Sequence, residues 1–319
     1  MATNDLAARS RAFDGLTPWA GNVPEGFIAD FLGGLTDMSF LPEGASPRAP
    51  ARSANPALPV IGDGDNGEPW LEAVDWLEAA RAAVGHFTMI TLGANYGAQA
   101  VGAWLAVQWL NPMPCRLVLV EPEPTNFERM VRHLRTNGIN PNDHWLIRSA
   151  LNDTGDPVFF TVGAPGSGSQ KIVGREAFLK KLTRLGRARK SLRSLVRSNT
   201  TGIVRPLVPG YDWQVEVKLM SAIRLPEILG PLDFVDYLES DIQQAEEIVF
   251  PPFVDLLRRK VRRVHIGTHG SEVHTKLRTL FADDGWEIVF DYPPETRNES
   301  SLGPFLTNDG VLTAVNPRL

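Results

Sequence analysis

A pair of glycines at the end of an apolar run is the feature that most constrains this chain. Residues 89–97 read Met-Ile-Thr-Leu-Gly-Ala-Asn-Tyr-Gly, and residues 117–122, one helix's length later, read Leu-Val-Leu-Val-Glu-Pro. An apolar run ending in glycines predicts a strand that enters a tight turn, where the missing Cβ lets a ligand lie against the backbone. The second run predicts the next strand of a βαβ unit, and its terminal Glu121 can accept hydrogen bonds from ribose hydroxyls. Together the two runs indicate a nucleoside site.

The glycine spacing narrows the class of nucleoside. A dinucleotide fold needs G-x-G-x-x-G so that a pyrophosphate can lie on a helix N-terminus, whereas three residues separate Gly93 from Gly97. A P-loop is excluded because no Gly-Lys-Ser/Thr follows. The spacing is similar to the looser turn of proteins that bind S-adenosylmethionine (SAM), which carries a sulfonium and a ribose but no phosphate. An ordinary βα turn is the alternative for the glycines alone, and Glu121 favours the cofactor.

Strand-like and helix-like segments alternate along most of the chain. An amphipathic helix over 68–83 precedes the first strand at 88–92. Further strands are expected over 116–120, 144–148, 157–162, 232–238, 261–266, 286–291 and 311–315, and further helices over 97–109, 125–137, 244–258 and 272–283. Such alternation predicts a mostly parallel sheet with helices on both faces and ligands at the carboxyl ends of the strands. The expected class is therefore α/β with a Rossmann-like core.

Two segments interrupt this pattern. Residues 1–65 are rich in Pro and Gly but retain aromatic side chains, so we expect an N-terminal arm or cap over a main domain at 66–319. An insertion at about 164–213 begins with a Gly/Ser-rich stretch and continues as a basic segment with an apolar stripe. An insertion of this length beside a sheet is where a lid is expected.

The basic segment, 171–205, stands out from an otherwise acidic chain. It holds eleven Lys and Arg residues and one acid, Glu176, although the whole chain has a net charge of -5. This excess favours an anionic acceptor, such as an acidic glycan, or peripheral contact with an anionic membrane that carries a lipid-linked acceptor. Nucleic acid is not expected because aromatic residues are not interleaved. A solvated helix that balances an acidic neighbour is the alternative.

Composition points to a soluble enzyme. No run of about 18 apolar residues is present, so no transmembrane segment is expected. The first residues lack the basic and apolar regions of a signal peptide, and a cytoplasmic location is therefore expected. The single cysteine, Cys115, excludes an internal disulfide and fits a buried small residue better than a nucleophile. Nothing in the sequence fixes the oligomeric state.

Three titratable residues follow or end the later strands. Asp241 can hold the amino group of a bound methionine part, orient a substrate hydroxyl or bind a metal, and an N-cap is the structural alternative. His269 lies past a strand end, where an imidazole can act as a general base near neutral pH, bind substrate or ligate a metal. His265 lies within an apolar run, as a core histidine or a site residue. The three could together bind a divalent metal, although no motif supports this.

As a set, these motifs resemble those of the FkbM-type SAM-dependent methyltransferases. The resemblance covers roughly residues 85–291 and rests on the segments 91–97, 120–127, 134–139, 149–153, 236–246 and 265–269. It implies a class I methyltransferase fold, SAM as cofactor, and O-methylation of a hydroxyl on a sugar, glycan, glycolipid or polyketide. It also implies a set of cofactor contacts: Thr91, Gly93, Ala94, Asn95 and Gly97 along the cofactor, Glu121 at its ribose, and Ala150, Leu151 and Asn152 beside its adenine.

Two departures from that pattern keep alternatives open. Thr91 replaces the acid that usually opens the glycine motif, and Glu239-Ser-Asp-Ile-Gln-Gln244 replaces Lys-Ile-Asp-Val-Glu-Gly. Thr91 leaves one carboxylate fewer for the cofactor's amino group, and Gln243 removes a candidate base or metal ligand. A protein that binds SAM without transferring its methyl group, as a partner in a biosynthetic assembly, is therefore the second hypothesis. An NAD-dependent oxidoreductase is the third.

Overall fold

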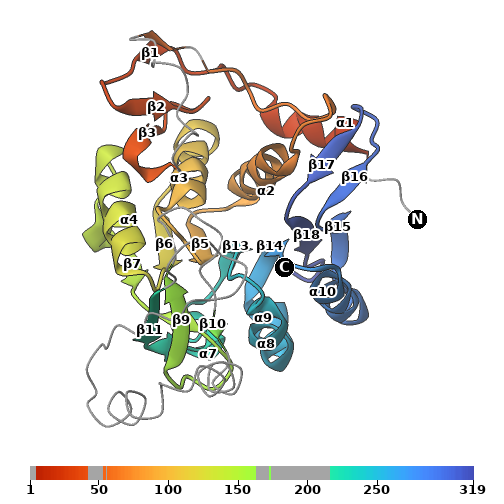
Figure 1. Ribbon diagram of the computed structural model, residues 1–319. Helices are drawn as coiled ribbons and strands as arrows, with labels where there is room; N and C mark the ends of the chain where they lie inside the picture. Colours follow the sequence, from red (N-terminus) through yellow and green to blue (C-terminus); the bar gives the residue numbers. More distant parts are fainter. Residues whose placement is uncertain (1–4, 42–52, 55, 163–171, 174–215) are drawn as a thin grey trace.

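A seven-stranded sheet forms the centre of the protein in the computed structural model, which describes residues 5–41, 53–54, 56–162, 172–173 and 216–319 (Figure 1). The strands are β5 (Phe87–Leu92), β6 (Cys115–Val120), β7 (Trp145–Ile147), β13 (Val235–Ser240), β14 (Val261–Thr268), β15 (Glu287–Tyr292) and β18 (Gly310–Val315). Their spatial order is β15-β18-β14-β13-β5-β6-β7. The chain therefore starts in the middle of the sheet, fills one side and then the other.

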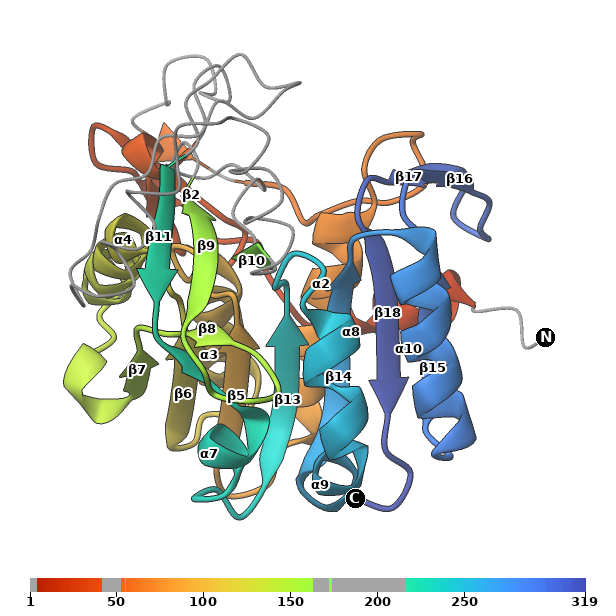
Figure 2. The same ribbon diagram turned by 60° about the horizontal axis from the view of Figure 1, so that its bottom comes forward.

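Strand direction identifies the type of α/β fold. β7, β6, β5, β13 and β14 pair in parallel, whereas β18 is antiparallel to both β14 and β15. Figure 2 shows β13 and β18 running in opposite directions. In a dinucleotide-binding Rossmann fold the sixth strand continues the parallel sheet at its edge. Here the last strand, β18, lies antiparallel between β14 and β15. This is the class I methyltransferase arrangement, and the expected Rossmann-like α/β fold is confirmed.

Helices cover both faces of the sheet (Figures 1 and 2). One face carries α2 (Glu68–Ala82), α3 (Ala98–Leu110) and α4 (Pro124–Thr136), and the other carries α7 (Leu225–Leu229), α8 (Glu246–Val249), α9 (Val254–Lys260) and α10 (Ser271–Asp283). Successive residues of β5 enter opposite cores: Met89 packs with the first group and Ile90 with the second. Both faces of the sheet are thus buried, which explains why every residue of β5 is buried and why its apolar residues do not alternate with exposed ones.

Two expected elements differ from those observed. The helix expected over 244–258 is divided into α8, a 3-10 turn at Pro251–Phe253, and α9. Pro251 and Pro252 cause the break, because proline supplies no backbone donor and clashes with the preceding turn. The strand expected over 232–238 lies at 235–240, so Asp241 is the first residue beyond it.

Smaller elements surround the core. The N-terminal residues form α1 (Leu6–Arg9), β1 (Gly21–Asn22), β2 (Phe27–Ala29), β3 (Leu35–Asp37) and β4 (Ser53–Ala54), with 3-10 turns at Ser10–Phe13 and Met38–Phe40. The turn at Ser10–Phe13 packs on α2 and β3 packs on α4. On α2 the rings of Phe13 and Trp70 lie 6.0 Å apart and those of Phe31 and Trp76 stack at 5.8 Å. These contacts explain why the Pro- and Gly-rich start of the chain keeps its aromatic residues.

The remaining strands lie near the carboxyl edge. They are β8 (Ala150–Leu151) with β12 (Ala222–Ile223), β9 (Val158–Val162) with β10 (Ile172–Val173) and β11 (Glu216–Met220), and β16 (Thr296–Asn298) with β17 (Phe305–Thr307). A 3-10 turn at Pro141–Asp143 precedes β7. Apart from β10, the expected basic insertion lies outside the described residues. Among the helices that the structure describes, none is long and apolar enough to cross a membrane.

Candidate functional site

The glycine turn after β5 lies against the end of β13. Gly93 and Gly97 both have a φ of 82°, and Asn95 between them has a φ of 50°. A Cβ added to Gly93 would lie 2.0 Å from the backbone oxygen of Asp241, whose own amide donates to Leu92 at 2.9 Å. Glycine is therefore required at 93 both by the left-handed backbone and by the neighbouring chain. The close approach brings the predicted cofactor turn next to Asp241.

Glu121 ties the glycine turn to the next strand. Its side chain is 3% exposed, and its two oxygens accept the backbone amides of Asn95 and Glu123, each at 2.8 Å. Burial raises the pKa of Glu121 to about 8. The nearby negative charges also raise this pKa, whereas the two hydrogen bonds lower it. Each carboxylate oxygen has a second lone pair. Ribose hydroxyls can therefore donate to Glu121 without displacing either amide.

Thr91 lies deeper than the other predicted cofactor residues. It is 2% exposed, and its hydroxyl has no hydrogen-bond partner. In the sheet it pairs with Glu239 of β13, whose pKa burial raises well above the ordinary value. Ala94 is 5% exposed in the turn above. Thr91 thus lies beneath the turn, inside the sheet.

The residues predicted to border adenine lie at the same edge. Ala150 and Leu151 form β8 directly after β7, and the amide of Glu121 donates to Ile147 at the end of β7. Asn152 closes a local turn, because it accepts the amide of Gly155 at 2.7 Å and donates to the carbonyl of Asp156 at 2.9 Å. The glycine turn therefore follows β5, Glu121 follows β6, and residues 150–152 follow β7, and these three strands are neighbours in the sheet.

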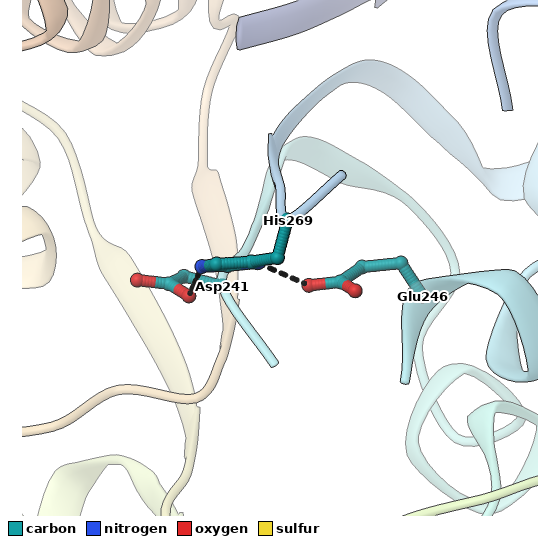
Figure 3. Close-up of side chains that lie close together, drawn as sticks. All are labelled: Asp241, Glu246 and His269. Carbon is teal, nitrogen blue, oxygen red and sulfur yellow. Dashed lines mark ion pairs between the residues drawn. The ribbon is translucent and has the colours of Figure 1, made fainter. Parts of the chain in front are cut away.

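A second group of polar side chains follows β13 and β14 (Figure 3). The Nε2 atom of His269 lies 2.7 Å from Gln243 Nε2, 3.2 Å from Asp241 Oδ1 and 3.6 Å from Asp309 Oδ1. On the other side of the ring, Nδ1 lies 3.5 Å from Glu246 Oε1. We call Asp241, Gln243, Glu246 and His269 the edge cluster. It brings together two predicted residues, Asp241 and His269, and adds Glu246, which the sequence analysis missed.

A strained turn holds the edge cluster in place. Gln243 and Gln244 have φ values of 55° and 77°, which non-glycine residues rarely adopt. The amide of Ile242 donates to Glu246 Oε1 at 2.9 Å, so the first residue of α8 stabilises the turn that carries Asp241. In the FkbM-type motif Lys-Ile-Asp-Val-Glu-Gly, a glycine occupies the position of Gln244. That glycine is the sequence signal for a left-handed residue at this position.

The charges of the edge cluster act on His269. Burial by itself lowers the pKa of this imidazole, but the polar contacts with Asp241 and Glu246 and their charges outweigh burial and raise the pKa to about 10. With no ligand bound, His269 is therefore protonated at neutral pH. A general base must be unprotonated, so the predicted role of His269 as a base requires that something first lower its pKa.

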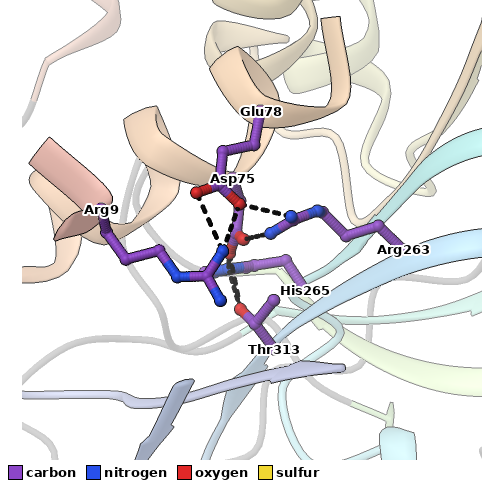
Figure 4. Close-up of polar contacts among 6 residues, drawn as sticks. All are labelled: Arg9, Asp75, Glu78, Arg263, His265 and Thr313. Carbon is purple, nitrogen blue, oxygen red and sulfur yellow. Dashed lines mark hydrogen bonds and ion pairs between the residues drawn. The ribbon is translucent and has the colours of Figure 1, made fainter. Parts of the chain in front are cut away.

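His265 lies in a different environment (Figure 4). It is 2% exposed, and its Nδ1 lies 2.7 Å from Asp75 Oδ2 and 3.2 Å from the hydroxyl of Thr313. Asp75, on α2, also pairs with Arg263 of β14. We call these four residues the inner network. It binds α2 to β14 and β18, and it accounts for His265 without catalysis. The predicted metal trio is therefore not assembled, because Glu246 and not His265 joins Asp241 and His269.

Comparisons with known proteins find similarity to solved structures only at low identity. No protein-family model and no curated protein matches the sequence. Among solved structures, precorrin-6y C5,15-methyltransferase from Geobacter metallireducens matches at 11% identity and a TM-score of 0.39, covering 77% of this chain and 87% of that one. Methyltransferase FkbM from Methylobacillus flagellatus matches at 10% identity and a TM-score of 0.39, covering 76% and 54%. Aeropyrum pernix fibrillarin, solved with natively bound SAM, matches at 13% identity and a TM-score of 0.34, covering 77% and 76%. At such values the strand order, not these matches, carries the fold assignment.

Proposed function

We propose that this protein is a SAM-dependent O-methyltransferase. The observation that carries the proposal is the hydrogen bond from Asn95 of the glycine turn to Glu121, at the carboxyl edge of β5 and β6. In an open α/β sheet this edge, where the strand order reverses, is the usual ligand site. Glu121 supplies acceptors for ribose hydroxyls, and the turn between Gly93 and Gly97 leaves its backbone open to the cofactor. Ala150, Leu151 and Asn152 border the adenine.

The acceptor would lie over the edge cluster. Methyl transfer is an in-line displacement, in which the acceptor oxygen attacks the methyl carbon while the sulfur leaves with the bonding pair, and its rate depends mainly on alignment. The hydroxyl proton must also leave, and His269 and Asp241 are the groups placed to take it. A cofactor ammonium beside Asp241 would offset the negative charge that raises the pKa of His269. Cofactor binding would thereby prepare His269 to act as a base.

Resemblance to the FkbM type suggests the class of acceptor. Relatives of that type mostly methylate hydroxyls of sugars, glycolipids and polyketides, and we propose the same class here. The excess of positive charge in 171–205 favours an anionic or lipid-linked member of it. Charge reversal at Arg187, Arg189, Lys190 and Arg193 should then raise the acceptor KM steeply at low salt and much less at high salt.

Turnover of SAM tests the proposal. Purified protein is incubated with SAM and a panel of sugar, lipid-linked sugar and polyketide acceptors, and S-adenosylhomocysteine is measured with the methylated product. We expect one acceptor class to be methylated on oxygen. His269→Ala should lower the rate by about two to four orders of magnitude with little change in SAM affinity. An unchanged rate would move the base role to Asp241.

The second candidate is a protein that binds SAM without catalysis. The unpartnered hydroxyl of Thr91, where relatives carry an acid, and the raised pKa of His269 favour it. Binding of SAM without turnover on any acceptor would support this candidate. Formation of S-adenosylhomocysteine above the rate without acceptor would dismiss it.

A further inference from the structure

Polar atoms of Gln243, Asp241 and Asp309 converge on one ring nitrogen, Nε2 of His269, at the carboxyl edge. We propose that His269 Nε2, Asp241 and Gln243 bind one divalent cation, with Glu246 supporting the imidazole from its other side. The proposal does not depend on SAM, because none of these side chains is needed to hold the ribose or adenine. The site replaces the trio of Asp241, His265 and His269 considered from the sequence.

The separations fit the first shell of a cation. Ligands bonded at about 2.1 Å to one metal ion, at right angles to each other, lie about 3 Å apart. Around His269 Nε2 the nearest polar atoms of Gln243 and Asp241 lie at 2.7 Å and 3.2 Å, and Asp309 Oδ1 lies at 3.6 Å. Asp309 is half exposed on its side chain. It can therefore join the shell or leave that position to water.

The contact between Gln243 and His269 joins two nitrogens. If Nε2 of His269 carries a proton, two donors face each other. Rotating the amide by 180°, which exchanges its oxygen and nitrogen, would remove that conflict but would turn the oxygen towards Asp241, which now accepts the amide at 2.9 Å. A cation in place of the proton can bind His269, the rotated amide of Gln243 and Asp241 together. An imidazole nitrogen, an amide oxygen and a carboxylate oxygen are all metal ligands.

Two buried atoms of the edge cluster have no hydrogen-bond partner. They are Nδ1 of His269, whose side chain is 10% exposed, and Oε2 of Glu246, whose side chain is fully buried. Buried polar atoms are rarely left unpaired. A metal-bound histidine usually donates its other ring N–H to a carboxylate, and Glu246 lies 3.5 Å from Nδ1 in that position. Binding of a cation would fix the proton on Nδ1 and direct it to Glu246.

The ligand set indicates the class of cation. One imidazole with carboxylate and amide oxygens suits Mn²⁺ and similar first-row ions, whereas Mg²⁺ and Ca²⁺ prefer oxygen alone and soft metals prefer thiolate. The only cysteine, Cys115, lies on β6. We therefore choose Mn²⁺ as the probe. At this edge the cation would bind an acceptor oxygen and make its hydroxyl more acidic, and in the cation-bound protein this would replace the role of His269 as a base, with the proton released to water.

Binding of Mn²⁺ alone tests the site. The full chain is treated with a chelator, which is then removed, and Mn²⁺ is titrated without SAM while the electron paramagnetic resonance signal of free Mn²⁺ is followed. We expect one Mn²⁺ per chain. His269→Asn and Asp241→Asn should weaken binding at least 100-fold, and Glu246→Gln by about 10- to 100-fold, as for a supporting carboxylate. Gln243→Glu, which adds a charged oxygen, should tighten it.

A second histidine–carboxylate pair serves as the matched control. His274, 2% exposed on α10, lies 3.0 Å from Asp291 Oδ1 and 2.9 Å from the hydroxyl of Thr268, so both its ring nitrogens have partners. His274→Asn should leave Mn²⁺ binding unchanged, and thermal unfolding of every variant shows that it is folded. The proposal is wrong if folded wild-type protein binds no Mn²⁺, or if wild type and His269→Asn bind Mn²⁺ with the same affinity. This outcome does not depend on whether the protein binds SAM or transfers its methyl group.

Discussion

His265 and His269 lie four residues apart on or just past β14, yet their surroundings differ in kind. In the inner network Asp75 accepts hydrogen bonds from His265, Arg263 and Thr313, and so joins α2 to two strands. In the edge cluster His269 lies close to Asp241, Gln243 and Glu246, and to Asp309 outside the cluster, but one buried atom each of His269 and Glu246 has no hydrogen-bond partner. A polar group whose partners are complete stabilises a fold, and one whose partners are incomplete is suited to a ligand. The comparison separates His265, whose role is structural, from His269, for which we propose a functional role.

The largest expected effect comes from breaking the inner network. Asp75→Ala leaves His265 buried without its carboxylate and Arg263 with Glu78 as its remaining carboxylate partner, and it should lower the free energy of unfolding by about 3 to 5 kcal/mol. Chemical denaturation measures it. Glu272→Ala, which removes an exposed partner of Lys276, is the control and should have almost no effect. Equal stability of the two variants would show that the inner network does not hold α2 to the sheet.

The next prediction concerns the affinity for SAM, which should fall when Glu121 is removed. At pH 9, above the pKa of about 8 of Glu121, Glu121→Ala should weaken SAM binding by about 1.5 to 3 kcal/mol, the range for losing a hydrogen bond to a charged group. Glu123→Gln is a matched variant: Glu123 is equally buried, and its Oε2 caps α4 by accepting the amide of Asn126 at 2.8 Å. It should bind SAM nearly as wild type does. Calorimetry that found both variants unaltered would remove Glu121 from the site.

Glu121 should also make stability depend on pH. Its pKa is about 8 in the folded protein against 4.5 for the ordinary group, so the folded state holds its proton more tightly. The resulting stabilisation is complete below pH 4.5 and is lost as pH rises through 8. Between pH 6 and 9 we expect wild type to lose roughly 1 to 2.5 kcal/mol more than Glu121→Gln. If the free energy of unfolding of wild type and of Glu121→Gln changed equally with pH, the burial of this carboxyl group would be contradicted.

The smallest effect is expected for the stability of an edge-cluster variant. His269→Asn should lower the free energy of unfolding by less than Asp75→Ala does, because no complete hydrogen-bond network is lost. Denaturation beside Asp75→Ala gives the comparison directly. A loss as large as that of Asp75→Ala would make His269 a structural residue like His265.

Much of the fold follows from the sequence, because local patterns determine it. The alternation of apolar runs and amphipathic segments predicts the order of strands and helices, and the turn from Gly93 to Gly97 is found where its glycines predict it. The reversed insertion of β18 does not follow, since an apolar run carries no direction. Pro251 and Pro252 did carry a signal for the divided helix.

The site was only partly predictable, because it depends on contacts between distant segments. The carboxyl ends of neighbouring strands placed Asp241 with His269 as expected. The pairing of His265 with Asp75 joins residues 190 apart in sequence, and no local pattern reports it. Glu246 begins a helix in sequence, and only the left-handed turn at Gln243 and Gln244 brings it back to His269.

Calorimetric titration with SAM and, separately, with NAD is the measurement that tests the central claim most directly. We propose that the glycine turn and Glu121 bind a ribose without a pyrophosphate, so SAM should bind at one per chain and NAD should give no heat. Glu121→Ala in the same experiment places the binding at this edge. Tight binding of NAD with no heat from SAM would contradict the account and favour an oxidoreductase.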